Sequence, residues 1–514
     1  MLAYIGRRIA VMFVILFGSS FLIFNAAAYA GDPTEGLRTN TSPQAHQKLI
    51  ALIRDLHLNI PPPARYFLWL KGIGKVFTGH IDLGLTRDHN PVSTAISNAI
   101  PITIRLLLLS FILAIFVGIG FGIVSALRQY SRFDYALTFI AFLMYSLPIF
   151  WVAVLLKEYL AISFNNFLLN GEIAPLWILL ASGASGFFWA AVISGTRKRV
   201  FSIFGIAAAA TAFFLFFLSL SKWFTHPGLG PIMMLILGLG FAFGITYLST
   251  GIGNKAALRS SIAVVAIGFV LYFPVEYFLK RDANLLTIIV MAVITIAIAI
   301  GVAYFFTKID RRPVIRTSVM TSILVGILFI FDKLMKTWVP YINSDAIHQR
   351  PIPTISEGNS LLPSGNFWFS SLDTVLHLAL PTIALVLITM AAYLRYSRGT
   401  MLEVMNQDYI RTARAKGLPE RTVIMRHAFR NTLIPITTIL VVDFAGIMGG
   451  AIITENVFGW HGMGSLFNLA VHTQDLNLLM GVFLFTASLV IMANLVADLL
   501  YSALDPRIRV VGKH

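Results

Sequence analysis

A polar segment between residues 395 and 435 concentrates the charged side chains of the second half of the sequence. Its basic residues are Arg395, Arg398, Arg411, Arg414, Lys416, Arg421, Arg426 and Arg430. On both sides of Gly417-Leu418-Pro419, apolar residues recur at three- and four-residue spacing, which predicts two short amphipathic helices separated by a turn. The pattern comprises Leu402, Met405, Tyr409, Thr412 and Ala413, then Val423, Ile424, His427 and Ala428. A basic helix–glycine–helix segment between two membrane spans suits the docking of a partner protein. The alternative is a solvated loop whose arginines only fix membrane topology.

The other chemically active side chains form no catalytic or metal-binding pattern. The chain has no Cys, and the histidines lie on separate segments without ligand spacing (His377, His427, His461 and His472). It has no G-x-x-x-x-G-K-[ST] sequence to hold ATP phosphates. No Ser-His-Asp order or paired carboxylate is present. We therefore predict no catalytic residue, no metal site, no cofactor and no enzyme activity in this chain.

One carboxylate, Asp443, lies within an apolar run expected to span the membrane at about 432–454. A carboxylate at that depth costs several kcal/mol unless it faces water, a partner or the bundle interior. Both a pathway or gating role and a structural role, through an interhelical hydrogen bond or a protonated carboxyl, are open. Gly446, Gly449 and Gly450 on the same helix indicate close approach of a neighbouring helix. These four residues are our candidates for a translocation pathway.

The composition is that of an integral membrane protein. Hydrophobic residues make up 57% of the chain, charged residues 12%, and the mean hydropathy is +0.80. A soluble domain has about a quarter of its residues charged. The net charge of +16 could indicate nucleic-acid binding. However, the basic residues lie mostly in short loops between apolar runs, as the positive-inside rule requires.

The predicted fold is all-α, with about twelve membrane-spanning helices and both termini in the cytoplasm. The runs at 101–127 and 135–156 are long enough to cross a hydrocarbon core of about 30 Å. The runs lie at about 9–30, 101–127, 135–156, 174–194, 202–220, 231–250, 261–279, 285–306, 316–332, 373–394, 432–454 and 476–500. The first has a competing interpretation as a signal peptide, since Ala26, Ala27, Ala28 and Ala30 resemble a cleavage site. We favour a retained span because the run is long.

Several motifs resemble one family of transport proteins. YIRTARAKGLPERTVIMRHAFRNTLIP (residues 409–435) resembles the coupling loop of ABC importer permeases of the oligopeptide/dipeptide/nickel family. The general motif of such loops has a glutamate, and here Arg411 stands about where it would be, as is common in the peptide-transporting members. MYSLPIFWVAVLL, TENVFGWHGMG and LDPRIR are also similar to family segments. The resemblance covers about 1–155 and 365–510.

The resemblance implies a cell-membrane permease subunit of an ATP-driven importer of oligopeptides or dipeptides. Its partners would be a second permease subunit, two ATP-binding subunits that hold ATP and Mg, and an extracytoplasmic substrate-binding protein. In that family the loop inserts into a groove on the ATPase. The implied coupling residues are Tyr409, Arg411, Thr412, Ala413, Arg414, Ala415, Lys416, Gly417, Leu418, His427, Arg430 and Asn431.

The predicted organisation is a six-helix permease core of type I importers, interrupted by six additional spans. The core comprises 1–155, with an external loop at 31–100, and 365–510, with the coupling loop at 395–435. The inserted block is 160–350. A single-chain twelve-helix secondary transporter is the alternative, but it predicts two similar halves, and no repeat is seen. A nickel or other small-solute permease is also open. A membrane-embedded enzyme built from the six extra spans is disfavoured because they show no acidic or histidine cluster.

Overall fold

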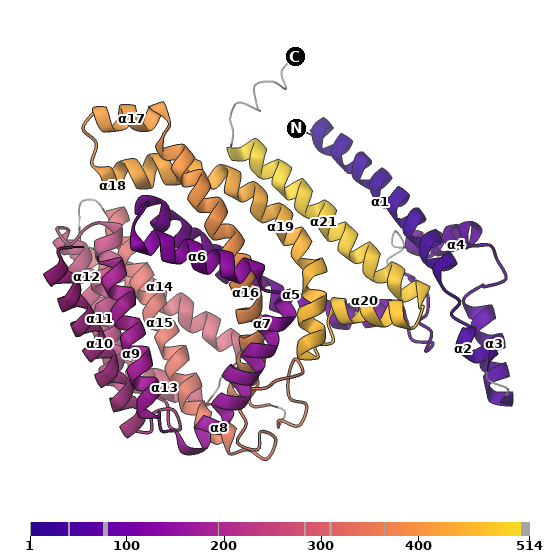
Figure 1. Ribbon diagram of the computed structural model, residues 1–514, viewed down its shortest axis with the longest axis horizontal. Helices are drawn as coiled ribbons and strands as arrows, with labels where there is room; N and C mark the ends of the chain where they lie inside the picture. The colour runs from indigo at the N-terminus through magenta and orange to yellow at the C-terminus, as the bar shows by residue number, and fades with distance from the viewer. Residues whose placement is uncertain are drawn as a thin grey trace. The chain divides into compact units, whose positions relative to one another are not determined.

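The computed structural model describes residues 2–39, 42–75, 81–193, 195–281, 284–307, 311–363 and 365–504. Every regular element within these ranges is a helix (Figure 1), in agreement with the predicted fold class. The chain forms two compact units. The first comprises Met1–Leu160, Thr354–Glu357 and His377–His514, and the second comprises Ala161–Pro353 and Gly358–Leu376.

The first unit begins with a long apolar helix and ends with another. Its helices are α1 (Leu2–Ala30), α2 (Glu35–Arg38), α3 (Pro43–Asp55), α4 (Pro62–Gly74), α5 (Val92–Leu127), α6 (Arg132–Ser146), α7 (Ile149–Leu156), most of α16 (Phe367–Met405), α17 (Asp408–Ala415), α18 (Glu420–Thr422), α19 (Phe429–Phe458), α20 (Met463–His472) and α21 (Leu476–Leu504). The segment predicted as an external loop at 31–100 therefore contains three complete helices, α2 to α4, and the start of α5, which begins at Val92 and not at about residue 101.

Small residues set the distance between α5 and α16. A Cβ atom on Gly122 would overlap Ser397 Oγ and lie 2.6 Å from the Leu394 carbonyl oxygen. One turn earlier, a Cβ atom on Gly118 would lie 2.7 Å from the Cβ atom of Tyr393. Because glycines four residues apart share one helix face, this face admits the backbone of α16 at close range. The fixed contact positions the end of α16 that carries the 395–435 segment.

The third predicted span, at 135–156, is wrong in its boundaries. The helix breaks at Leu147, which has an extended backbone with ψ of 130°, and Pro148 precedes the first residue of α7. Proline disfavours helical backbone in the preceding residue and lacks an N–H group, so it starts a new helix here instead of kinking one. The apolar helix long enough to span a membrane is Ile149–Asn170, which includes a π-helical turn at Lys157–Ile162.

The second unit contains the six additional apolar runs, and each is helical as predicted. Its helices are α8 (Ser163–Asn170), α9 (Pro175–Val192), α10 (Arg197–Leu220), α11 (Gly230–Ser249), α12 (Lys255–Val270), α13 (Tyr272–Arg281), α14 (Leu285–Phe306) and α15 (Arg311–Ile342). The run predicted at 261–279 is bent by 54° between α12 and α13. Pro274, in the first turn of α13, has no N–H group to continue the hydrogen-bond ladder of α12.

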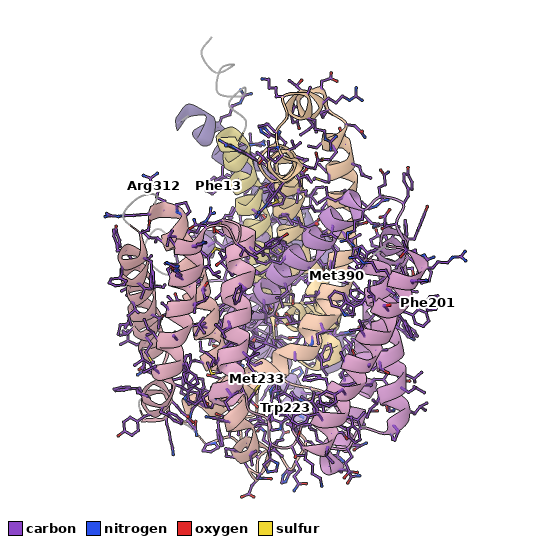
Figure 2. All side chains as sticks on the ribbon, turned by 90° about the vertical axis from the view of Figure 1, so that its left-hand side faces the viewer. Phe13, Phe201, Trp223, Met233, Arg312 and Met390 are labelled. Atoms are coloured by element: carbon purple, nitrogen blue, oxygen red, sulfur yellow. The ribbon has the colours of Figure 1, made fainter. Side chains whose placement is uncertain are left out.

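Apolar side chains cover the outer surface of the second unit. Figure 2 shows Phe201 projecting from the outer side of α10, and 76% of its surface is exposed. None of the residues of α10, all of which are described, is buried. An exposed helix with apolar residues on all sides is stable in a lipid environment, because exposing that surface to water is unfavourable.

Ten helices in the described residues are long and apolar enough to cross a membrane, or eleven if the bent α12–α13 pair is one span. This is close to the predicted number of about twelve. The predicted span at 432–454 corresponds to α19, whose side chains are described only in part.

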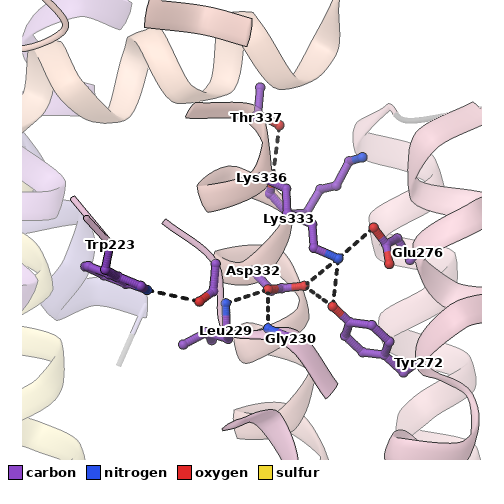
Figure 3. A network of polar contacts seen from close by, with 10 residues as sticks. Trp223, Leu229, Gly230, Tyr272, Glu276, Asp332, Lys333, Lys336 and Thr337 are labelled. Carbon is purple, nitrogen blue, oxygen red and sulfur yellow. Dashed lines mark hydrogen bonds and ion pairs between the residues drawn. The ribbon is translucent and has the colours of Figure 1, made fainter. Parts of the chain in front are cut away.

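A buried carboxylate organises the polar interior of the second unit (Figure 3). Asp332 of α15 is 3% exposed and accepts hydrogen bonds from the N–H groups of Leu229 and Gly230, at 2.9 and 3.1 Å. The Tyr272 hydroxyl donates to the same carboxylate at 2.6 Å. Lys336 lies 3.4 Å from Asp332 and 2.7 Å from Glu276. The carboxylate thus joins the start of α11, the start of α13 and α15.

Candidate functional site

The 395–435 segment folds as an elbow between α16 and α19. Helix α17 ends at Ala415, and Gly417 has the left-handed backbone, with φ of +74°, that commonly closes a helix. Pro419 then starts the short helix α18, which continues through a π-helical turn, η3 (Val423–Ala428), into α19. The predicted break at Gly417-Leu418-Pro419 is therefore present.

The first of the two predicted short helices is wrong in its extent. Leu402 and Met405 belong to the end of α16, and α17 begins only at Asp408, after the extended backbone of Gln407. Ile410 and Ala413 form the buried side of α17, whereas Tyr409 is 42% exposed. The predicted spacing continued through a turn that the sequence does not mark. Tyr409 and Thr412 were therefore assigned to the apolar face, whereas Ile410 takes that place beside the correctly assigned Ala413.

The elbow has its own small hydrophobic core. This core is formed by one side chain of α5 and six residues of the elbow and the end of α16: Ala126, Met401, Val404, Ile410, Ala413, Val423 and Ala428. Thr432 adds a hydrogen bond to Met401 Sδ at 3.3 Å. Because both arms of the elbow pack on the end of α16, a force on the elbow is transmitted to α16 and α19 together.

The outer surface of the elbow is polar and basic. Most of the predicted coupling residues are exposed there: Tyr409, Arg411, Thr412, Arg414, Ala415, Lys416, Gly417, Leu418 and Arg430. His427 and Asn431 are half-buried, and Ala413 belongs to the hydrophobic core. Arg414 donates to both carboxylate oxygens of Glu420, at 2.7 and 3.2 Å, across the Gly417 turn. These hydrogen bonds lower the pKa of the Glu420 carboxyl group.

An ion pair that the sequence did not reveal attaches α16 to the turn between α5 and α6. Arg398 donates from Nε and Nη2 to the two carboxylate oxygens of Asp134, at 2.7 and 2.8 Å. Ser125 and the Tyr130 N–H group donate to the same carboxylate. The Asp134 side chain is 2% exposed, and the Arg398 hydrogen bonds lower its pKa to about 2. The pair is 264 residues apart in sequence, which is why spacing gave no signal.

The predicted pathway residues all lie on α19. The Asp443 side chain is half-buried. Gly446, Gly449 and Gly450 are helical, and their surroundings lie outside the described part of the chain. Both roles that the sequence leaves open for Asp443, in a pathway and in an interhelical hydrogen bond, stay predictions.

Comparison with known proteins shows the family of this chain. Residues 284–510, which include the whole elbow, match the family described as "Binding-protein-dependent transport system inner membrane component". The oligopeptide transport system permease protein OppB of Mycobacterium tuberculosis is 43% identical over 147 residues, covering 29% of this chain and 45% of that protein. A peptide permease protein of Brucella suis is 36% identical over 237 residues, covering 44% of this chain and 68% of that protein. The chain belongs to the family of inner-membrane components of binding-protein-dependent transport systems.

A further relative aligns along the entire chain. The oligopeptide transport system permease protein AppB of Bacillus subtilis is 26% identical over 511 residues, covering 99% of both proteins. With ten helices among the described residues that are long and apolar enough to cross a membrane, this inner-membrane component is a multi-pass membrane protein of an ABC transport system.

The four histidines considered in the sequence analysis lie on separate segments of this inner-membrane component. His377 is buried in α16, and His461 contacts Glu357 with Nδ1 3.1 Å from its carboxylate. Among the residues the structure describes, no three histidine or acidic side chains gather in a metal-binding group.

Proposed function

We propose that this chain is one of two permease subunits of an ATP-driven importer that carries oligopeptides or dipeptides into the cell across the cytoplasmic membrane. The printed names of the relatives support this substrate class, since they are oligopeptide, dipeptide and peptide permeases. In this proposal both termini are cytoplasmic. ATP and Mg are held by two partner ATPase subunits, and an extracytoplasmic binding protein delivers the peptide. The permease chain itself performs no catalysis.

The observation that carries the proposal is the construction of the elbow. Its inner side is a closed hydrophobic core attached to α16, and its outer side presents exposed basic residues around Gly417. An element with a packed core and a charged outer surface is suited to bind a partner protein and to transmit the movement of that partner. Closure of the ATPase dimer would move the elbow, and with it α16 and α19, as a rigid body. Asp443, Gly446, Gly449 and Gly450 on α19 would then line the path that opens and closes.

Charge reversal on the outer side of the elbow tests the docking role. Arg411 has 71% of its side chain exposed and Lys416 is exposed, so Arg411→Glu with Lys416→Glu leaves the hydrophobic core intact. We expect the purified double variant to lose the ATPase subunits in a pull-down and to lose uptake of a radiolabelled dipeptide. Its thermal midpoint should match that of the unmodified protein.

The matched control reverses two exposed charges on the second unit. Lys198→Glu with Arg199→Glu changes the same number of charges at the start of α10, on the side predicted to be cytoplasmic. This control should keep both the ATPase subunits and uptake. Retention of both by the elbow variant would overturn the proposal. Parallel uptake of nickel, with none of dipeptide, would correct the substrate class while leaving the importer intact.

A further inference from the structure

A cavity of about 220 Å³ lies in the first unit, at the end of α1 remote from its N-terminus. Its walls come from α1, α3, α4, the segment 82–85 and the start of α21, and they include Phe24, Leu68, Trp69, Leu85, Gln474 and Asn477. The proposed topology places this end outside the cell. The volume is below the ~300–1,000 Å³ of sites for drug-sized ligands, so it suits one small group and its apolar neighbour.

Two buried hydrogen-bond donors in the cavity wall have no acceptor. Neither Nε of Arg65 nor Nε1 of Trp69 has a hydrogen-bond partner in the described structure, although both atoms are buried. Trp69 is 8% exposed, and both residues line the cavity. They are four residues apart on α4, so they share one helix face. A buried donor without an acceptor is costly, and two on one face indicate a missing ligand.

The charges around the cavity define what that ligand must supply. Arg65 keeps its charge under all ordinary conditions, and burial lowers its pKa with no carboxylate compensating. Its guanidinium carbon lies 5.8 Å from the centre of the Phe24 ring. The two carboxylates of the wall already have cationic partners, since Asp55 contacts Arg54 at 3.2 Å and Asp82 contacts Lys75 at 2.9 Å. The donors of Arg65 and Trp69 would therefore be satisfied by a ligand with a single anionic hydrogen-bond acceptor next to an apolar group that packs on Phe24.

We propose that this cavity binds the carboxylate end of a short peptide, with the carboxylate on Arg65 and Trp69 and the terminal side chain against Phe24. This assignment rests on the proposed function for its ligand class. A single negative charge is favoured over a more highly charged anion, because Asp55 and Asp82 in the same wall repel excess negative charge. The cavity is thus a recognition site for substrate on the external side of the permease.

Binding can be measured on the full chain in nanodiscs of phosphatidylcholine, with N-acetyl-leucine as the probe and N-acetyl-leucinamide as its neutral counterpart. Calorimetry should show the carboxylate bound roughly tenfold or more tightly than the amide, as a charge-assisted hydrogen bond predicts. Arg65→Gln should abolish that preference, and Trp69→Phe should reduce it a few-fold because it removes only a neutral donor. Lys71→Gln, which removes an exposed positive charge on the same helix outside the cavity lining, should bind like the unmodified protein.

Four results would overturn the assignment, and the first three concern binding. These are equal binding of acid and amide, full binding by Arg65→Gln, and loss of binding by Lys71→Gln. A fourth is a lipid occupant, in which native mass spectrometry finds phosphatidylglycerol retained through Arg65 and N-acetyl-leucine fails to displace it. Association with ATPase subunits is measured on the same preparations. If ATPases bind and the carboxylate does not, the cavity assignment fails while the importer proposal stands.

Discussion

Thr103 and Glu455, which are 352 residues apart, meet in a fully buried hydrogen bond of 2.6 Å between Oγ1 and Oε1. The same hydroxyl oxygen accepts the N–H group of Met463 at 2.8 Å. Oε2 of Glu455 accepts the N–H groups of Gly464 and Ser465, at 2.7 and 3.1 Å. One carboxylate therefore joins α5, the end of α19 and the first turn of α20, where free N–H groups favour negative charge.

Removing this carboxylate should destabilise the first unit. Glu455→Ala leaves two backbone N–H groups and a hydroxyl group buried without their acceptor, at about 1–3 kcal/mol for each unsatisfied group. We expect the thermal midpoint in detergent to fall by about 5 °C or more. Glu455→Gln, which keeps part of the network, should fall less. Glu357→Gln is the control, because this carboxylate faces the exposed His461. An unchanged midpoint for Glu455→Ala would show that the network carries no stability.

The ion pair between Asp134 and Arg398 should stabilise the protein at every pH from about 4 to 8. The pKa of Asp134 is held at about 2 in the folded protein, below the ordinary value of about 3.9. Its stabilisation is therefore complete above the unfolded pKa and is lost as the pH falls from about 4 through 2. Asp134→Asn leaves Arg398 without its partner, which costs about 3–5 kcal/mol when such a pair is buried.

The pH profile of the thermal midpoint checks that prediction. Between pH 5 and 8, Asp134→Asn should melt lower than the unmodified protein by a constant amount, and the two midpoints should converge as the pH falls from 4 toward 2. Glu403→Gln is the control, since this exposed carboxylate lies on the same helix as Arg398. A difference that instead grows on acidification would contradict the sign of the shift.

The contact between α5 and α16 offers a test within one helix. Gly122→Ala places a methyl group against Ser397 and the backbone of α16, and such overpacking costs about 1–3 kcal/mol. Gly120→Ala is the matched control, because a Cβ atom there meets nothing within 4 Å. We expect a lower thermal midpoint for Gly122→Ala and an equal or slightly higher one for Gly120→Ala, since alanine favours helix. Equal midpoints for both variants would mean that the two helices separate at little cost.

The sequence predicted what depends on neighbouring residues and missed what depends on distant ones. The six additional helices and the Gly417 turn were predictable because runs of apolar residues and a glycine–proline pair are local signals. The break at Pro148 was missed because a proline in an apolar run is compatible with either a kinked or an interrupted helix. The elbow gave a strong signal, but its exact apolar face depended on the turn at Asn406 and Gln407. Pairings such as Asp134 with Arg398 arise only when the helices pack.

The network around Asp332 makes a further prediction for the second unit. Asp332→Asn should lower the thermal midpoint because it removes the charge that faces Lys336 and leaves a poorer acceptor for Leu229, Gly230 and Tyr272. Lys336→Gln should also destabilise, but Glu276 shares that ammonium group at 2.7 Å. The double variant should therefore cost less than the two single variants together, by at least about 0.5 kcal/mol.

Lys333→Gln completes this cycle as the control, because Lys333 lies on the same helix and makes no ion pair within the described part of the chain (Figure 3). It should leave the free energy of unfolding within about 0.5 kcal/mol of that of the unmodified protein. Strict additivity of Asp332→Asn and Lys336→Gln would contradict direct coupling between the two charges. In that case the Asp332 carboxylate would stabilise the unit only through its hydrogen bonds to the backbone of Leu229 and Gly230. The contribution of Lys336 would then come from its ion pair with Glu276.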